Sequence, residues 1–159
     1  MNSGEAAARV AALLAARGQR VAVAESSAGG LVAARLLAQP GASAFFRGGA
    51  VVYTAAAREG LLGILPAEME GMRPSTEAYA GLLAARARER LGADWGLAET
   101  GAAGPAGNRY GDPAGHACLA VSGPVARART IATGSADRAA NMDAFATAAL
   151  LLLEEALSG

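Results

Sequence analysis

Two serines lie where an apolar segment runs into a pair of glycines. The apolar residues 21–24 are followed by Glu25, Ser26 and Ser27, and glycines occupy positions 29 and 30. A strand that turns into a helix in this way exposes a hydroxyl at the edge of a sheet, beside helix N–H groups without intrahelical partners and the positive end of the helix dipole. The sequence therefore predicts an exposed serine at a turn that suits an anion or an oxyanion.

A second glycine-rich segment, residues 99–107, directly follows an apolar segment that ends at Ala98. Its glycines at positions 101, 104 and 107 would allow the backbone to approach a phosphate or a sugar, because no Cβ stands in the way. A flexible surface turn is the alternative. Ligands of open α/β sheets bind outside the carboxyl ends of strands, and both glycine-rich segments follow predicted strands. This placement favours a ligand-binding loop.

Several familiar sites are excluded by residue type. All 14 basic residues are arginine, so no lysine can act as a general base or complete a Walker loop. Residues 25–30 do not supply the G-x-G-x-x-G of a dinucleotide site, and Glu25 stands where a G-x-S-x-G elbow needs glycine. A Ser-His system would depend on His116 alone, for which a structural role in a strand is favoured. Cys118, two residues further on, is expected to be buried, and no metal site is predicted.

Composition indicates one domain over residues 1–159 that can bury a real core. The formal net charge is zero, with 14 acidic and 14 basic residues, which gives no general attraction for nucleic acid or an anionic membrane. The amino terminus lacks a basic signal segment, and no apolar run approaches the roughly 18 residues of a membrane span. With one cysteine and no disulfide, we expect a cytoplasmic protein.

The elements that position these residues alternate between helix and strand. Helices are predicted over residues 4–17, 31–38, 55–63, 74–91 and 136–157, and strands over 20–24, 47–53, 94–100, 115–122 and 125–133. The strands are apolar without clean alternation, as in a sheet covered on both faces. The last two strands are joined so closely that a hairpin is expected. The predicted fold is therefore α/β, a three-layer α/β/α sandwich with a mixed, mostly parallel central sheet.

The ordered motifs resemble the CinA carboxy-terminal domain, the family of nicotinamide mononucleotide (NMN) deamidases, over nearly the whole chain. The family pattern Ala-Glu-Ser-x-Thr-Gly-Gly is similar to residues 24–30, with Ala28 in place of the threonine. The strand Arg-Gly-x-Val-x-Tyr-Ser/Thr is similar to residues 47–54, and Leu-Leu-Gly-Val to residues 61–64. The loop Thr-Gly-x-Ala-Gly-Pro-x-Gly matches residues 100–107, and a later Pro-x-Gly matches residues 113–115.

The resemblance implies hydrolysis of the NMN carboxamide to nicotinate mononucleotide and ammonia, with no metal or cofactor. Ser26 would be the nucleophile, and N–H groups near Gly29 and Gly30 would stabilise the oxyanion. The other catalytic candidates are Tyr53 and Arg58. A small NMN-like nucleotide would be the ligand, and homo-oligomers are common in the family. The residues expected to bind the ligand are Glu25, Ser27, Gly29, Gly30, Arg47, Thr100, Gly101, Gly104, Gly107 and Arg138.

The chain departs from the family pattern at the base and at one anion contact. Arg58 aligns with the family lysine and stays protonated at ordinary pH, so it is a poor proton acceptor. Tyr53, or Glu25 through water, could replace that base. The family's last helix begins Asp-Arg and carries a second arginine four residues on, where this chain has Met142. Three interpretations stay open: an amidohydrolase with an altered base, a nucleotide-binding protein without the chemistry, and an enzyme for another amide or phosphate compound.

Overall fold

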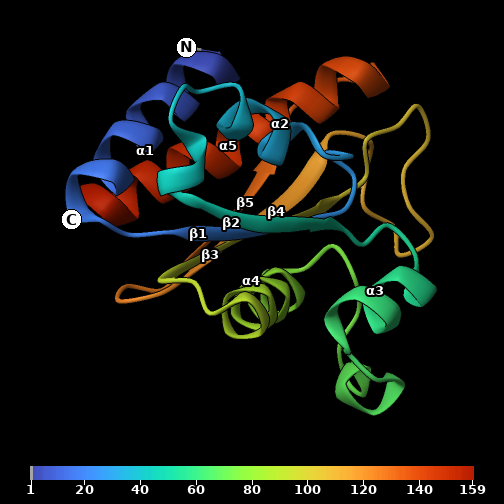
Figure 1. The fold of residues 1–159 in the computed structure, drawn as a ribbon. Helices are drawn as coiled ribbons and strands as arrows, with labels where there is room; N and C mark the ends of the chain where they lie inside the picture. The colour runs from blue at the N-terminus through green and yellow to red at the C-terminus, as the bar shows by residue number, and fades with distance from the viewer. Residues whose placement is uncertain (1) are drawn as a thin grey trace.

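A central five-stranded sheet organises residues 2–159, the part of the chain described by the computed structural model (Figure 1). The strand order is β2-β1-β3-β4-β5. The strands are β1 (Val21–Glu25), β2 (Phe46–Val51), β3 (Trp95–Gly101), β4 (His116–Ser122) and β5 (Arg127–Ala132). Within this described part, β2, β1 and β3 are parallel, β4 is antiparallel to β3, and β5 is antiparallel to β4. Only β4 therefore runs against the other four strands.

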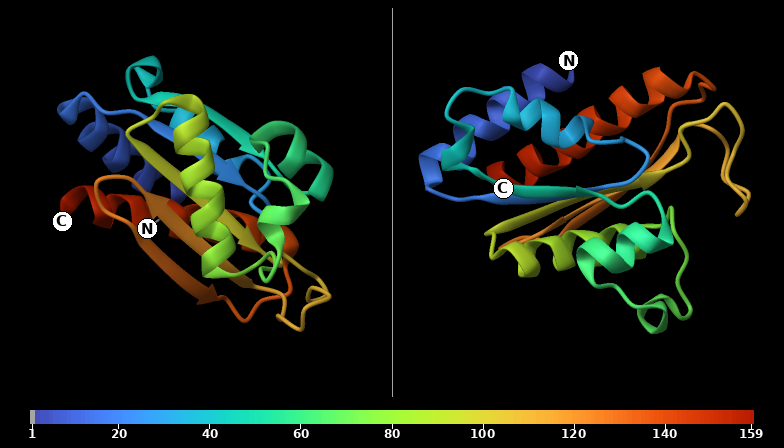
Figure 2. Two further views of the ribbon diagram at one scale, coloured as in Figure 1. Left: turned by 90° about the horizontal axis from the view of Figure 1, so that it is seen from below. Right: turned by 45° about the vertical axis from the view of Figure 1, so that its right-hand side comes forward.

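Helices cover both faces of this sheet (Figure 2). On one face lie α1 (Ser3–Arg17), α2 (Leu31–Leu37) and α5 (Arg138–Ser158), and on the other lie α3 (Ala55–Leu62) and α4 (Glu77–Leu91). Short 3₁₀ turns occupy Ala42–Ala44 and Pro66–Met69. The predicted three-layer α/β/α sandwich with a mixed, mostly parallel sheet is confirmed, as is the β4–β5 hairpin. No helix in residues 2–159 has both the length and the apolar character needed to cross a membrane.

The ends of the elements follow local capping chemistry and differ from the predicted ends by a few residues. Helix α5 begins at Arg138 rather than at residue 136, because the Asp137 side chain accepts a hydrogen bond from the Ala140 N–H and so caps the helix. Helix α4 begins at Glu77 rather than at residue 74, because Thr76 is its N-cap and accepts from the Tyr79 N–H. The residues that precede α4 are thereby free to take another conformation.

The two faces of the sheet carry side chains of different size. The face under α1, α2 and α5 presents Val23, Leu97 and Trp95, whereas the face under α4 presents small residues. The small residues on the α4 face are Ala22, Ala24, Gly96, Ala98 and Ala120. A Cβ built on Gly96 would lie 2.0 Å from the Ala84 carbonyl oxygen in α4. The middle of helix α4 therefore packs against the backbone of β3.

We predict that Gly96→Ala destabilises the protein by about 2 kcal/mol or more, because the new methyl group meets backbone atoms that cannot rotate away. The midpoint of urea unfolding measures this loss. Gly81→Ala is the matched control, since Gly81 lies in α4 with no atom within 4 Å of its built Cβ. That control is expected to be stabilised by about 1 kcal/mol through helix propensity. Equal midpoints for the two variants would contradict the close packing of α4.

Candidate functional site

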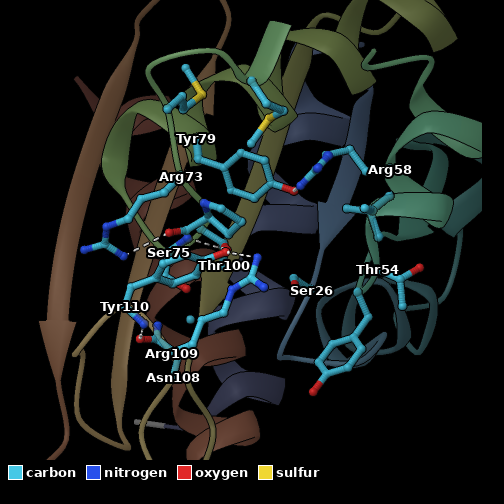
Figure 3. Close-up of a pocket in the computed structure, with 17 residues that line it drawn as sticks. Ser26, Thr54, Arg58, Arg73, Ser75, Tyr79, Thr100, Asn108, Arg109 and Tyr110 are labelled. Atoms are coloured by element: carbon cyan, nitrogen blue, oxygen red, sulfur yellow. Dashed lines mark hydrogen bonds between the residues drawn. The ribbon is translucent and has the colours of Figure 1, made fainter. Parts of the chain in front are cut away.

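The carboxyl ends of the three parallel strands meet at one edge of the sheet. Glu25 pairs with Val51 on one side and with Glu99 on the other, so the segments that follow β1, β2 and β3 emerge together. They border a cavity of about 490 Å³ (Figure 3). The residues that line the cavity are Ser26, Val52, Tyr53, Thr54, Ala55, Arg58, Met69, Met72, Arg73, Pro74, Ser75, Tyr79, Thr100, Gly101, Asn108, Arg109 and Tyr110.

A smaller cavity of about 140 Å³ lies next to the first and shares Tyr53, Gly101 and Asn108 with it. Its remaining lining residues are Ser27, Ala102, Ala103, Gly104, Ala106, Gly107 and Arg138. The segment after β3 therefore borders both cavities. The two serines of the turn are divided between them, because Ser26 lines the larger cavity and Ser27 the smaller one.

Two buried glutamates hold the turn after β1. Glu99, fully buried in β3, accepts hydrogen bonds at Oε1 from the N–H groups of Ser26 (3.0 Å) and Ala28 (2.8 Å). Its Oε2 accepts from the Ser27 hydroxyl. Glu25, 1% exposed, accepts from the N–H groups of Val32 (3.0 Å) and Ala33 (2.9 Å) in the first turn of α2. The two carboxyl groups thus accept hydrogen bonds from the turn and from the helix that follows it.

Burial has the largest effect on the pKa values of Glu25 and Glu99. It raises the pKa of Glu99 to about 7, although the hydrogen bonds from Ser27, Ala28 and Ser26 favour the charged form. Burial also raises the pKa of Glu25, against the opposing effect of the helix N–H groups. Repulsion from Glu25 adds to the shift at Glu99. The carboxyl group that anchors the turn therefore changes charge near neutral pH.

The two serine hydroxyls have different surroundings. No group in residues 2–159 forms a hydrogen bond with the Ser26 hydroxyl, which belongs to a half-buried residue at the larger cavity. The Ser27 hydroxyl is buried and donates to Glu99. The backbone of Ser26 is fixed, because its N–H also lies 3.1 Å from the Glu99 carbonyl oxygen. Ser26 thus combines a fixed backbone with a hydroxyl free to meet a ligand.

The glycine N–H groups expected to receive an oxyanion already have acceptors. The Gly29 N–H donates to the Ser26 carbonyl at 3.1 Å, and the Gly30 N–H is directed to the Glu25 carboxyl group. Gly29 and Gly30 adopt left-handed backbone angles, with φ of 70° and 106°, and neither lines the two cavities. A Cβ on Gly29 would lie 2.7 Å from the methyl group of Met142. These glycines shape the turn and the packing of α5 against it.

The glycines of the second loop make close approaches within the protein. A Cβ on Gly101 would lie 2.5 Å from the His116 carbonyl oxygen, and one on Gly107 would lie 2.3 Å from that of Asp112. At Gly104, which has φ of 107°, a Cβ would lie 2.9 Å from the Ala136 carbonyl oxygen. At these three positions the backbone of a neighbouring segment leaves no room for a Cβ, which explains why each is glycine. The loop still borders the smaller cavity through all three of them.

Tyr53, Arg58 and Thr100 lie together at the larger cavity. Arg58 donates from Nη1 to the Tyr79 hydroxyl (3.3 Å), and its guanidinium lies 5.6 Å from the centre of that ring. Tyr53 is 60% exposed at the rim, where its hydroxyl accepts from Nη2 of Arg138 (3.3 Å). Nη1 of Arg138 donates to the Gly104 carbonyl. Arg138 therefore bridges two elements at the smaller cavity.

Besides Gly29 and Gly30, two more of the expected ligand contacts lie outside both cavities for a structural reason. Arg47 lies near the amino end of β2, away from the carboxyl edge, and its Nε donates to the Leu91 carbonyl (2.8 Å) at the end of α4. Glu25 is enclosed between β1 and the first turn of α2. The Glu25 side chain is buried, with 1% of the residue exposed, and lines neither cavity.

The cavity also contains residues that sequence patterns did not single out. Ser75 has a φ of 62°, and its N–H donates to the Thr100 hydroxyl (3.1 Å). Its carbonyl lies 3.0 Å from Nε2 of His116 and 3.5 Å from Sγ of Cys118. His116 thus contacts the backbone of Ser75, and no hydrogen bond joins it to Ser26 in the described residues. Burial raises the pKa of the Cys118 thiol.

The loop after β3 contributes Asn108, Arg109 and Tyr110 to the same cavity. The sequence did contain a signal for these residues, because polar and aromatic residues in a loop after a strand commonly bind ligands. Arg73 and Ser75 gave no such signal, because their segment is brought to the cavity only by the packing of α4.

Comparison with known proteins gives one consistent match. Residues 4–157 match the family described as the CinA C-terminal domain. The chain is 45% identical over 150 residues to a CinA-like protein of Anaeromyxobacter sp. (strain K), covering 91% of this chain and 36% of that protein. It is 42% identical over 129 residues to a CinA-like protein of Synechocystis sp., covering 81% of this chain and 31% of that protein. The chain thus spans about a third of the length of these curated relatives.

Solved structures agree with these sequence matches. The chain superimposes with a TM-score of 0.92 on a competence-damaged protein (CinA) superfamily protein from Klebsiella pneumoniae 700603, with 30% identity and 99% of each chain covered. A competence/damage inducible protein from Agrobacterium tumefaciens gives a TM-score of 0.90 at 29% identity, covering all of this chain and 97% of that one.

We predict that Glu99→Gln reduces the dependence of stability on pH. The folded-state pKa of Glu99, about 7, lies above the ordinary 4.5, so its contribution to stability is complete below about pH 4.5 and is lost as the pH rises through 7. Glutamine keeps an acceptor for the Ser26 and Ala28 N–H groups and offers a donor to Ser27. Urea unfolding at pH 5 and pH 8 should show a smaller fall in stability for the variant.

Glu89→Gln, at an exposed position of α4, is the control and is expected to keep the wild-type fall between the two pH values. An equal fall in wild type and Glu99→Gln would contradict titration of Glu99 in the folded protein.

Proposed function

Because the chain belongs to the CinA C-terminal domain family, we propose that it is an amidohydrolase that converts NMN to nicotinate mononucleotide and ammonia. The observation that carries the proposal is the Ser26 hydroxyl, which lines the larger cavity and has no hydrogen-bond partner within residues 2–159. The anchoring of its backbone by Glu99 supports the same role, since a nucleophile must be held in place to attack.

In the proposed reaction, the Ser26 oxygen adds to the carboxamide carbon, and the hydroxyl proton passes, directly or through water, to the amide nitrogen. The tetrahedral intermediate collapses by breaking the C–N bond, and the protonated nitrogen departs as ammonia. Water then attacks the resulting ester, which releases the nicotinate carboxylate and restores the serine hydroxyl. Tyr53 and Arg58 lie at the same cavity. Arg58 stabilises negative charge in this scheme and does not accept the serine proton.

A second candidate function is binding of a pyridine nucleotide without efficient turnover. Two observations favour it. Among residues 2–159, no proton acceptor forms a hydrogen bond with the Ser26 hydroxyl, and Arg58, which aligns with the family lysine, interacts with Tyr79. General bases commonly contribute about 10² to 10⁴ in rate. We therefore expect slow turnover of NMN. An amide substrate other than NMN is the third possibility.

Residues 1–159 make up a single domain of this kind, of which Met1 lies outside the described residues. The domain acts on a small nucleotide in the cytoplasm as a homo-oligomer, without a cofactor and without a nucleic-acid partner. These statements follow the sequence and the family, and each is open to direct measurement.

We predict that Ser26→Ala lowers the release of ammonia from NMN by at least about 100-fold, because the covalent step is lost. A coupled ammonia assay on purified protein measures the rate. Ser122→Ala is the control, since Ser122 pairs with Gly96 at the far end of the sheet and lies outside both cavities. Undiminished turnover in Ser26→Ala would exclude Ser26 as the nucleophile.

We predict that Arg58→Lys increases the Ser26-dependent release of ammonia by at least about tenfold, because an amine can lose its proton whereas a guanidinium cannot. The pH profile of kcat should acquire a new ascending limb in this variant. Arg58→Gln, which removes the charge without supplying a base, is the comparison. If Arg58→Gln accelerates turnover as much as Arg58→Lys, the gain does not come from a proton acceptor.

A further inference from the structure

The larger cavity has an excess of positive charge. Three of its lining residues are Arg58, Arg73 and Arg109, and none of the described residues that line it is Asp or Glu. Only Arg73 is neutralised, because its guanidinium donates to both carboxylate oxygens of Asp112, at 2.8 and 3.3 Å. This hydrogen bond from Arg73 holds the pKa of Asp112 below its ordinary value. Two guanidinium groups therefore face the cavity without an ion-pair partner in residues 2–159.

Arg109 is exposed and contacts the neighbouring Tyr110. Its guanidinium lies 5.1 Å from the centre of the Tyr110 ring and donates to the Tyr110 hydroxyl at 3.0 Å. Arg73 lies 5.0 Å from the same ring centre. In Figure 3 the Arg109 side chain extends toward Ser26 and Thr100, whereas that of Arg73 extends away from them. A side chain that already contacts a neighbour loses less entropy when it binds an anion.

The loop that carries Arg109 is itself tightly hydrogen-bonded. Oδ1 of Asn108 accepts from the N–H groups of Tyr110 (3.0 Å) and Asp112 (3.1 Å), and Nδ2 of Asn108 donates to the Asp112 carboxylate (2.8 Å). The Asn108 N–H donates to the Asp112 carbonyl (3.1 Å). Asp112 thus joins the loop to Arg73, and Arg109 projects from a closed turn.

The alternative anion contact, on α5, is already occupied. Both terminal nitrogens of Arg138 have acceptors within the protein, the Gly104 carbonyl and the Tyr53 hydroxyl. One turn further along α5, Met142 packs its methyl group against Gly29. An anion at this place would have to replace both hydrogen bonds of Arg138, whereas within residues 2–159 the guanidinium groups of Arg58 and Arg109 each donate to a single tyrosine hydroxyl and keep further N–H groups for an anion.

We propose that the phosphate monoester of the ligand binds in the larger cavity to Arg109, with Arg58 as the second cation, and not to Arg138. This assignment rests on the proposed nucleotide-binding function. An arginine fork matches the oxygens of a phosphate and binds it by charge-assisted hydrogen bonds. Arg109 is accordingly the residue that makes the site prefer a nucleotide to its nucleoside.

Binding measurements in a Ser26→Ala background test this assignment, because the ligand then stays intact. Isothermal titration would compare NMN with nicotinamide riboside, which lacks the phosphate. Arg109→Gln is expected to weaken NMN binding by at least about tenfold and to leave riboside binding within about twofold. Arg109→Lys should restore part of the affinity, since it keeps the charge but not the fork. Arg138→Gln should change NMN binding by less than about threefold.

Arg127→Gln, at an exposed position of β5 outside both cavities, is the control for a general loss of positive charge. Loss of NMN affinity in Arg138→Gln but not in Arg109→Gln would overturn the assignment. Equal affinity of the parent protein for NMN and riboside would overturn it as well.

The proposed reaction and the phosphate site can fail separately. Absence of Ser26-dependent ammonia release, together with Arg109-dependent NMN binding, would reject the deamidase and support the phosphate site. If the parent binds neither NMN nor riboside, inorganic phosphate is the probe. Phosphate binding that Arg109→Gln abolishes would support the site, and no phosphate binding at about 10 mM would overturn it.

Discussion

The burial of two carboxyl groups at the ends of neighbouring strands is the constraint on which the site depends. Glu25 and Glu99 are partners in the β1–β3 ladder, and both are excluded from water. A buried carboxyl group must be compensated by hydrogen bonds, and here the donors come from the serine turn and the first turn of α2. The conformation that satisfies the carboxyl groups is the one that leaves the Ser26 hydroxyl at the cavity.

The small side chains on the α4 face of the sheet let the segment before α4 form the opposite wall of the larger cavity. Because small residues such as Gly96 lie under α4, that helix packs directly on the sheet and its preceding segment reaches the strand edge. Ser75 is held there in a left-handed conformation by contacts with Thr100, His116 and Cys118. Such a conformation costs about 1 to 3 kcal/mol and persists only where surrounding contacts enforce it. The same packing places Arg73 beside the loop of residues 108–112.

Because the chain has arginine and no lysine, its cations favour the binding of an anion but cannot accept the serine proton. A guanidinium is always charged and forms forked hydrogen bonds, so it suits an anionic ligand. The same property removes it as a proton acceptor, and Arg58 accordingly interacts with the Tyr79 hydroxyl and ring. An anion in the larger cavity would meet Arg58 and Arg109, neither of which has an ion-pair partner in residues 2–159. Attack by Ser26 needs a proton acceptor that must come from the ligand, from water or from a neighbouring hydroxyl.

The sequence by itself determined the α/β sandwich, the β4–β5 hairpin and the family, because these depend on local periodicity, capping and ordered motifs. It also predicted that both glycine-rich segments follow strands, and it favoured a ligand-binding loop for the second one, since ligands of open α/β sheets bind outside the carboxyl ends of strands. Only the tertiary structure decided that Arg47 caps α4, that Glu99 anchors the turn, and that Arg109 joins Ser26 at one cavity. Hydrogen-bond partners and cavity walls come from residues distant in sequence, and no local pattern encodes them.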